Sequence, residues 1–181
     1  MATWPANGVT DWNTEMLAYL AVGHDTDGTH NEAGLTRQVV NTQTGAVASN
    51  TTQIPYDDSI PQITEGSEYM TLAVTPTNVS NKLKIDIVFN LSVATGNRPT
   101  TVALFQDATA NALAAIIIGS DYPPRPICFT HYMAAGTTSE TTFRVRAGTD
   151  GAAALTFNGA GAARKLGGVL ASSITITEIQ V

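Results

Sequence analysis

The sequence predicts an all-β protein, in which a jelly-roll β-sandwich head follows a short N-terminal helix and an extended arm. Charged residues make up only 13% of the 181 residues, about half the usual share for a soluble protein. Threonine contributes 27 residues and accompanies many Val, Ile and Gly, a mixture that suits strands and tight turns better than helices. From residue 54 onward, short apolar segments alternate with turn residues.

One helix is expected near the N-terminus, capped by Asp11 and closed by Gly23. Four apolar residues share one face of it at i, i+4, i+7 and i+8, namely Trp12, Met16, Tyr19 and Leu20. A helix of about 12 residues is marginal alone. Its apolar stripe therefore needs burial, against its own head, symmetry mates or a partner protein. Together with Trp4, these are the candidate anchoring residues.

Residues 23–53 show no periodicity and are rich in Thr, Asn, Gln and Gly. Within them only the segment Leu35 to Val40 could pair as a strand. The stretch is otherwise predicted to be an extended arm, ordered by contacts with other molecules rather than by a core of its own. The expected division is a helix and anchoring arm at 1–53 and the head domain at 54–181.

The clearest element of the head is an amphipathic strand of roughly 12 residues. Six apolar residues at strict period two predict it: Leu83, Ile85, Ile87, Phe89, Leu91 and Val93. A helix could not place all six on one side. A strand at Tyr69 to Thr75, stopped by Pro76, comes before it.

Further strands are expected at short intervals, separated by Gly, Pro, Asn and Asp. They are Thr100 to Phe105, Leu113 to Ile118, Ile127 to Ala134, Thr141 to Ala147, Ala154 to Phe157 and Ser172 to Val181. In the last one the apolar residues change from even to odd positions, which predicts a bulge near Thr177 or Glu178. This many short strands in one domain indicate a β-sandwich, and a jelly roll in particular.

The net charge of −6 is unevenly distributed. Residues 1–60 hold seven acids and one base, whereas residues 61–181 hold eight of each. A basic surface for nucleic acid is therefore not expected. A nearly neutral head favours burial of part of its surface in an oligomer.

The sequence shows no disulfide framework, signal peptide or membrane-spanning segment. Cys128 is the single cysteine, so no intrachain disulfide is expected, and its apolar neighbours predict a buried small hydrophobe. The segment after Met1 has no basic or apolar stretch typical of a signal peptide, which suggests a reducing, cytoplasm-like environment. The run from Ala112 to Gly119 is too short to cross a bilayer.

Metal sites are not predicted. The spacing of His24, His30 and His131 matches no zinc motif. As an alternative, His24 or His30 could meet its own copies on a symmetry axis and trap a metal ion. The run Asp25-x-Asp27-Gly28 resembles the start of a calcium loop, but the twelfth position is Thr36 rather than Glu, so a simple Asx turn is expected.

No catalytic motif is apparent either. The chain has no Gly-x-Ser-x-Gly sequence, and the acids of the head are scattered singly rather than paired. The sequence therefore predicts a protein without enzymatic activity or cofactor.

Several stretches resemble proteins of bacteriophage virions. The run Gly23-His24-Asp25-Thr26-Asp27-Gly28-Thr29-His30 is similar to the N-terminal collar of phage fibre and spike proteins. The head resembles the C-terminal heads of phage fibres, which are similar to the trimeric jelly roll of the C1q/TNF class. The matching stretches are Thr75 to Leu83, Ala103 to Asp107, Asn111 to Ala114, Ala135 to Arg146 and Ser172 to Ile179.

The resemblance implies a homotrimeric spike or short fibre of the virion. Its arm would bind a capsid or tail protein, and its head would face outward, where it could bind a host-surface glycan. A capsid cement protein that stabilises the shell is the first alternative. A carbohydrate-binding module is the second, with Tyr122 and Tyr132 as candidate contact residues. Neither nucleic acid binding nor membrane insertion is expected.

Overall fold

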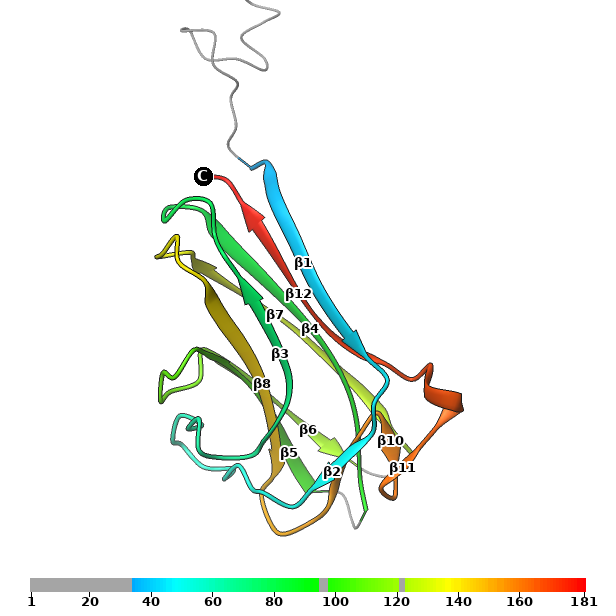
Figure 1. Ribbon diagram of the computed structural model, residues 1–181. Helices are drawn as coiled ribbons and strands as arrows, with labels where there is room; N and C mark the ends of the chain where they lie inside the picture. Colours follow the sequence, from blue (N-terminus) through cyan, green and yellow to red (C-terminus); the bar gives the residue numbers. More distant parts are fainter. Residues whose placement is uncertain (1–33, 95–97, 121–122) are drawn as a thin grey trace, which may run out of the picture. The chain divides into compact units, whose positions relative to one another are not determined.

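The computed structural model describes residues 34–94, 98–120 and 123–181, and the head is the compact unit Thr36–Val181. Antiparallel strands build almost all of it (Figure 1). They are β1 (Thr36–Thr44), β2 (Ala48–Asn50), β3 (Ser67–Val74), β4 (Lys82–Val93), β5 (Arg98–Gln106), β6 (Ala114–Ser120), β7 (Arg125–Ala134), β8 (Thr141–Thr149), β9 (Leu155–Phe157), β10 (Gly159–Ala160), β11 (Ala163–Arg164) and β12 (Ser172–Ile179), with one 3-10 turn, η1 (Leu166–Gly168).

The long strands pair in jelly-roll order. Counted along the chain without the short strands, the first pairs with the last (β1 with β12), and the second with the last but one (β3 with β8). The innermost pairs are β4 with β7 and β5 with β6. Contacts of β12 with β4 and of β8 with β5 join these pairs into a first sheet, β1-β12-β4-β7, and a second sheet, β3-β8-β5-β6. The predicted jelly-roll sandwich is confirmed.

Residues 36–50 belong to the head, although their sequence suggested an arm. Strand β1 includes all of the predicted segment except Leu35 and extends it to Thr44, and β2 adds a short pairing with β9. Because β1 has polar residues on both faces, its sequence does not show the alternation of apolar and polar residues that is typical of a strand. The head therefore begins at Thr36 rather than at residue 54. Residues 1–35 then carry five acids and no base, and the head carries ten acids and nine bases. The predicted helix at 11–23 lies outside the described residues.

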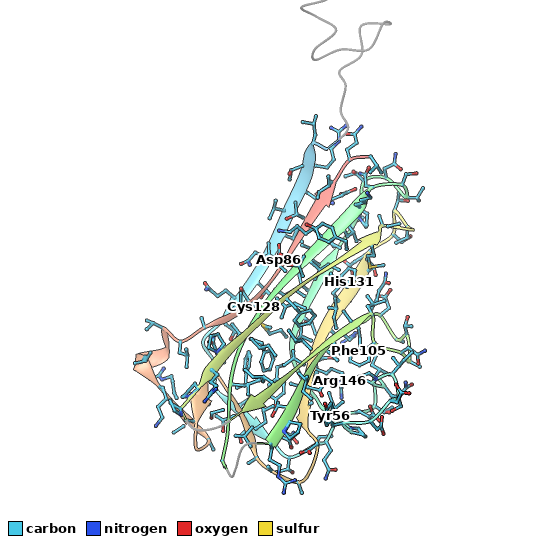
Figure 2. All side chains as sticks on the ribbon, turned by 180° about the vertical axis from the view of Figure 1, so that it is seen from behind. Tyr56, Asp86, Phe105, Cys128, His131 and Arg146 are labelled. Atoms are coloured by element: carbon cyan, nitrogen blue, oxygen red, sulfur yellow. The ribbon has the colours of Figure 1, made fainter. Side chains whose placement is uncertain are left out.

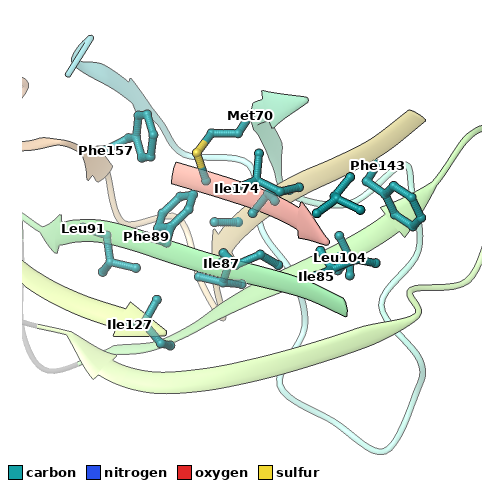
Figure 3. Close-up of a cluster of buried hydrophobic side chains, with 14 of the residues drawn as sticks. Met70, Ile85, Ile87, Phe89, Leu91, Leu104, Ile127, Phe143, Phe157 and Ile174 are labelled. Carbon is teal, nitrogen blue, oxygen red and sulfur yellow. The ribbon is translucent and has the colours of Figure 1, made fainter. Parts of the chain in front are cut away.

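Strand β4 is the centre of the first sheet and behaves as its alternation predicts. Its even-numbered residues are at least partly exposed from Lys82 to Val88, while its six odd-numbered apolar residues are all at most 1% exposed. They pack against apolar residues of β5, β8, β9 and β12, including Leu104, Phe143, Phe157 and Ile174 (Figure 3). Phe89 also meets Tyr69 edge-on and lies 4.8 Å from Phe157, centroid to centroid. One continuous apolar core therefore joins the two sheets.

The segment between β2 and β3 covers the outer face of the second sheet. Ile54, fully buried, packs there on Ala103 and Phe105 in a second small core. The Ile54 amide donates to the Thr149 carbonyl at 3.1 Å. A Cβ on Gly148 would lie 2.7 Å from the Ile54 nitrogen, so this close approach requires glycine.

The bulge predicted at Thr177 or Glu178 is absent from β12, so that prediction is wrong. The pairing of β12 with β4 runs without a shift from Ser173 to Ile179, and the irregularity lies opposite, in β1, between Thr36 and Gln38. Glu178 therefore keeps the inward face of Ile174 and Ile176 and is fully buried. Its hydrogen bonds, described below, replace the water that a carboxylate normally requires.

Candidate functional site

The outer face of the first sheet brings side chains from four strands, all but one of them polar, into two rows. In the first row Val39, Thr177, Lys84 and Tyr132 are aligned by register across β1, β12, β4 and β7. In the second row the aligned residues are Asn41, Thr175, Asp86 and Thr130. We call these eight residues the Tyr132 face.

Hydrogen bonds fix the side chains of the second row. Asp86 lies 2.8 Å from the Lys84 ammonium and accepts a 2.6 Å hydrogen bond from the Thr130 hydroxyl. Partial burial raises the pKa of Asp86, but the hydrogen bonds from Lys84 and Thr130 outweigh it and leave this pKa below its ordinary value. Asn41 Nδ2 donates to the Thr175 hydroxyl at 2.7 Å. The row thus presents preordered polar groups rather than mobile ones.

Tyr132 is the aromatic group of this face. Its side chain is 57% exposed, on the edge strand β7, directly opposite Lys84 in β4. An exposed ring beside fixed donors and acceptors can stack on a sugar ring and hydrogen-bond its hydroxyls. Asp86 and Cys128 are labelled along this sheet in Figure 2.

Cys128 and His131 lie on opposite faces of β7. Cys128 is exposed and faces outward, so the expected burial of its thiol is wrong. Strand β7 turns Ile127 and Phe129 inward instead, which leaves the residue between them on the surface. His131 is half-buried, and burial lowers its pKa. Within the described part of the chain, no three His, Cys, Asp or Glu side chains gather as a metal site.

Glu178 is the most strongly perturbed acid among the described residues. Its Oε1 accepts hydrogen bonds from the Thr77 amide (2.8 Å), the Thr77 hydroxyl (2.8 Å), Asn81 Nδ2 (2.6 Å) and the Asn78 amide (3.3 Å), and its Oε2 accepts one from Gln38 Nε2 (2.6 Å). Burial raises its pKa, but the donors outweigh burial and lower the pKa to about 2. Glu178 is thus held as an anion that ties β1 and the loop after β3 to β12.

A pocket with a volume of about 420 Å³ lies beside this anchor. Its lining is mostly polar and comprises Arg37, Thr77, Asn78, Asn81 and Gln180. Thr77 and Asn81 already donate to Glu178. A carboxylate with a pKa near 2 and no exposed surface is unsuited to general acid–base chemistry at neutral pH.

Most residues that the sequence suggested for anchoring or metal binding lie outside the described residues. These are Trp4, Trp12, Met16, Tyr19, Leu20, His24 and His30, together with Tyr122. Tyr132 is the one suggested contact residue that the structure places, and it is exposed. Tyr56 is 67% exposed, but the sequence does not indicate it as a candidate contact residue, because the segment around it shows no alternation of apolar and polar residues. Within the described ranges, no helix has the length and apolarity that a membrane span needs.

No protein-family model matches the chain, and no curated protein matches it in sequence. Several solved β-sandwich structures are similar. The xylan-binding CBM22-1 domain from Paenibacillus barcinonensis Xyn10C is 12% identical, with TM-score 0.38, over 84% of this chain and 99% of that one. The sugar-binding C-terminal domain of EclA is 13% identical, with TM-score 0.36, over 61% and 73%. A structure of infectious bursal disease virus is 11% identical, with TM-score 0.37, over 81% and 38%.

The chain therefore spans well under two thirds of the viral protein, and all three TM-scores are low. The fold assignment rests on the strand order of the head itself. The head is a β-sandwich of the kind found in binding and structural domains.

Proposed function

We propose that this protein is a bacteriophage virion structural protein that forms a homotrimeric spike or short fibre. Residues 1–35 anchor it to a capsid or tail protein, and the head faces outward. The observation that carries the proposal is the division of the chain at Thr36, between an acidic segment without a single base and a nearly neutral jelly roll. The similarity of both parts to phage fibre and spike sequences supports it.

The chemistry of the head supports a role without catalysis. The carboxylate of its buried acid, Glu178, accepts five hydrogen bonds. A second polar cluster, Glu68 with Arg144 and Arg146, spans β3 and β8, and Arg146 also donates to the Glu65 and Gly66 carbonyls at 2.8 Å. Such groups hold strands and loops together and so stabilise the head, as a virion protein exposed outside the cell requires.

Particle labelling tests this proposal. Antibodies against the head are expected to bind intact virions at discrete projecting sites in electron micrographs. Deletion of residues 1–35, which leaves β1 complete, is expected to yield a folded head that no longer enters particles. Particles that never carry the antigen would refute the proposed function.

The same deletion separates a spike from a capsid cement protein. If the truncated gene gives fragile or unassembled capsids, the protein is a cement that clamps the shell. If it gives stable particles that adsorb poorly to the host, the protein is an attachment spike. Deletion of a longer segment, such as residues 1–50, would remove β1 and β2 and unfold the head, so it could not distinguish the two roles.

The Tyr132 face favours glycan binding as a second candidate function. We expect Tyr132→Ala to weaken binding to any glycan that the head recognises by about tenfold, because one stacking contact is lost. Tyr132→Phe keeps the ring and should bind within about twofold of the wild type. Titration calorimetry with glycans selected on an array provides the measurement. An array without any bound glycan, or equal binding by Tyr132→Ala, would contradict this function.

A further inference from the structure

A loop at one side of the head carries two highly exposed aliphatic side chains. It runs over residues 161–170, through β11 and η1, and we call it the apolar loop. Leu166 is 72% exposed and Val169 is 82% exposed, more than any other large apolar side chain described. Two cations, Arg164 and Lys165, precede Leu166, and the loop contains no acid. An aliphatic pair in this position is costly in water unless a partner covers it.

The base of the apolar loop is rigidly held by one buried asparagine. Asn158 is fully buried, its Nδ2 donates to the Thr44 carbonyl at 2.8 Å, and its Oδ1 accepts from the Ser172 hydroxyl at 2.7 Å. The loop also touches the turn after β1, because a Cβ on Gly45 would lie 2.1 Å from the Gly168 carbonyl oxygen.

The backbone of the loop is strained at two residues, one in the turn between β10 and β11 and one in η1. Ala162 has φ 58° and Leu166 has φ 50°, in the left-handed region that non-glycine residues seldom adopt. Strained conformations of this kind concentrate where a protein presents groups for binding. The loop is thus a preordered projection, which loses little conformational entropy when it is buried.

A complementary hollow lies on the second sheet. It has a volume of about 240 Å³ and is lined by Tyr56, Pro99, Ile117 and Gly119. Tyr56 is 67% exposed and Ile117 is 41% exposed, so apolar surface is open to a partner here as well. Two exposed acids, Asp57 and Asp58, follow Tyr56 directly in the chain. A hydrogen bond from the Ser59 hydroxyl lowers the pKa of Asp57, which keeps it anionic.

The loop and the hollow match in both apolar character and charge. Leu166 and Val169 offer aliphatic groups to an apolar depression, and Arg164 and Lys165 would face Asp57 and Asp58. They cannot meet within one head. In Figure 1 the apolar loop lies at the right margin of the head, after β11, while the cyan segment that follows β2 and carries Tyr56 lies on the left. Figure 2, from behind, likewise labels Tyr56 on the side away from that loop.

We propose that the apolar loop of one copy seats in the Tyr56–Ile117 hollow of the next copy. Because the two surfaces differ, the contact is heterologous, and repeating it around an axis closes a ring. The inference rests on the homotrimer of the proposed function and identifies which surfaces join its subunits. Each subunit then uses one loop and one hollow, and a closed ring leaves none of either exposed.

Two variants and their mixture test this contact with the full chain. Leu166→Asp with Val169→Asp destroys the loop surface, and Ile117→Asp destroys the hollow. Each variant alone is expected to be a monomer in native mass spectrometry, with subunit affinity reduced about a hundredfold or more. Mixed in equal amounts, they should form a heterodimer and nothing larger, since only one intact loop and one intact hollow remain. Recovery of the dimer also shows that both variants are folded.

Val79→Asp provides the matched control, because Val79 is 50% exposed but belongs to neither surface. It should assemble like the wild type. If either variant remains a trimer, or if the mixture yields no heterodimer, the contact is refuted while the virion role stands. A wild-type chain that is itself a monomer would refute the trimer of the proposed function. Normal trimers with poor particle adsorption would assign the loop to a different partner and overturn the contact.

A charge exchange tests the polar part of the contact independently. Arg164→Glu with Lys165→Glu should weaken assembly at low salt, and so should Asp57→Lys with Asp58→Lys. All four changes in one chain should restore assembly, because each pair again faces the opposite charge. Failure of the fourfold variant to recover would contradict the pairing of these residues.

Discussion

Replacing Phe89 with alanine is expected to destabilise the head by about 4 kcal/mol, the largest effect of any single core truncation that we predict. Phe89 is fully buried at the middle of β4 and packs against the rings of Tyr69 and Phe157, at centroid distances of 5.5 and 4.8 Å. Its loss removes both the transfer free energy of the ring and the contacts of the cavity walls.

The neighbouring Val88 offers a matched control. It lies on the same strand but on the half-exposed outer face, so Val88→Ala should cost about 1 kcal/mol or less. Urea unfolding of both variants, monitored by far-UV circular dichroism, compares their free energies of unfolding. Equal urea midpoints of unfolding for Phe89→Ala and Val88→Ala would contradict the burial of only one face of β4 in the core.

Replacing Glu178 with alanine is expected to destabilise the head by about 3 kcal/mol, although no apolar group is lost. The change removes an acceptor from the side chains of Gln38 and Asn81 and from the backbone amide of Thr77. Gln38 keeps its bond to the Thr75 carbonyl and Asn81 its bond to the Thr77 hydroxyl. Asn81 is the buried member of the three, and a buried donor that loses its charged acceptor costs about 1–3 kcal/mol. Glu178→Gln retains one acceptor oxygen and should lose less. A cost of Glu178→Ala below that of Glu178→Gln would contradict the role of Glu178 as an anchor.

The stability that Glu178 contributes should depend on pH. Its pKa is about 2 in the folded protein and ordinarily 4.5, so the unfolded chain binds the proton more tightly. The contribution is therefore complete above about pH 5 and is lost as the pH falls toward 2. Glu178→Gln does not titrate, so the difference in unfolding free energy between it and the wild type should shrink over this range. A difference that is constant from pH 6 to pH 2.5 would contradict the lowered pKa.

The long strands could be predicted from the sequence because their burial follows a simple period. In β4 one face is apolar throughout, and in β8 Phe143, Val145 and Ala147 share the inner face, so alternation alone locates both strands and their inner faces. The number and spacing of strands predict the jelly-roll class, whereas the order of the strands, closed by the pairing of β1 with β12, follows only from the structure. Strand β1 was only partly predicted, since Gln38 and Thr42 occupy inward positions that are usually apolar.

The errors at Glu178 and Cys128 have opposite causes. At Glu178 period-two reasoning expects every inward position to be apolar, so it explains the change of apolar residues from even to odd positions by a bulge. The structure keeps the register because donors from distant segments, at Gln38 and near residues 77–81, satisfy the carboxylate. Cys128 was expected inside because of its apolar neighbours, yet alternation puts those neighbours, and not the thiol, in the core.

The candidate surfaces were predictable only in part. Tyr132 could be named from the sequence as an aromatic residue in a strand, but its alignment with Lys84 and Thr177 depends on register between four strands. The apolar loop and the Tyr56 hollow carry no sequence motif. Their significance follows from exposure, backbone strain and position on opposite sides of one rigid unit, which are properties of the folded head alone.

Native mass spectrometry of the full chain at micromolar concentration tests the central claim most directly. A homotrimer predicts a single species with three times the chain mass of 19.0 kDa. A monomer at this concentration would contradict the account, because the apolar loop and the hollow would then remain open to water and no ring would form.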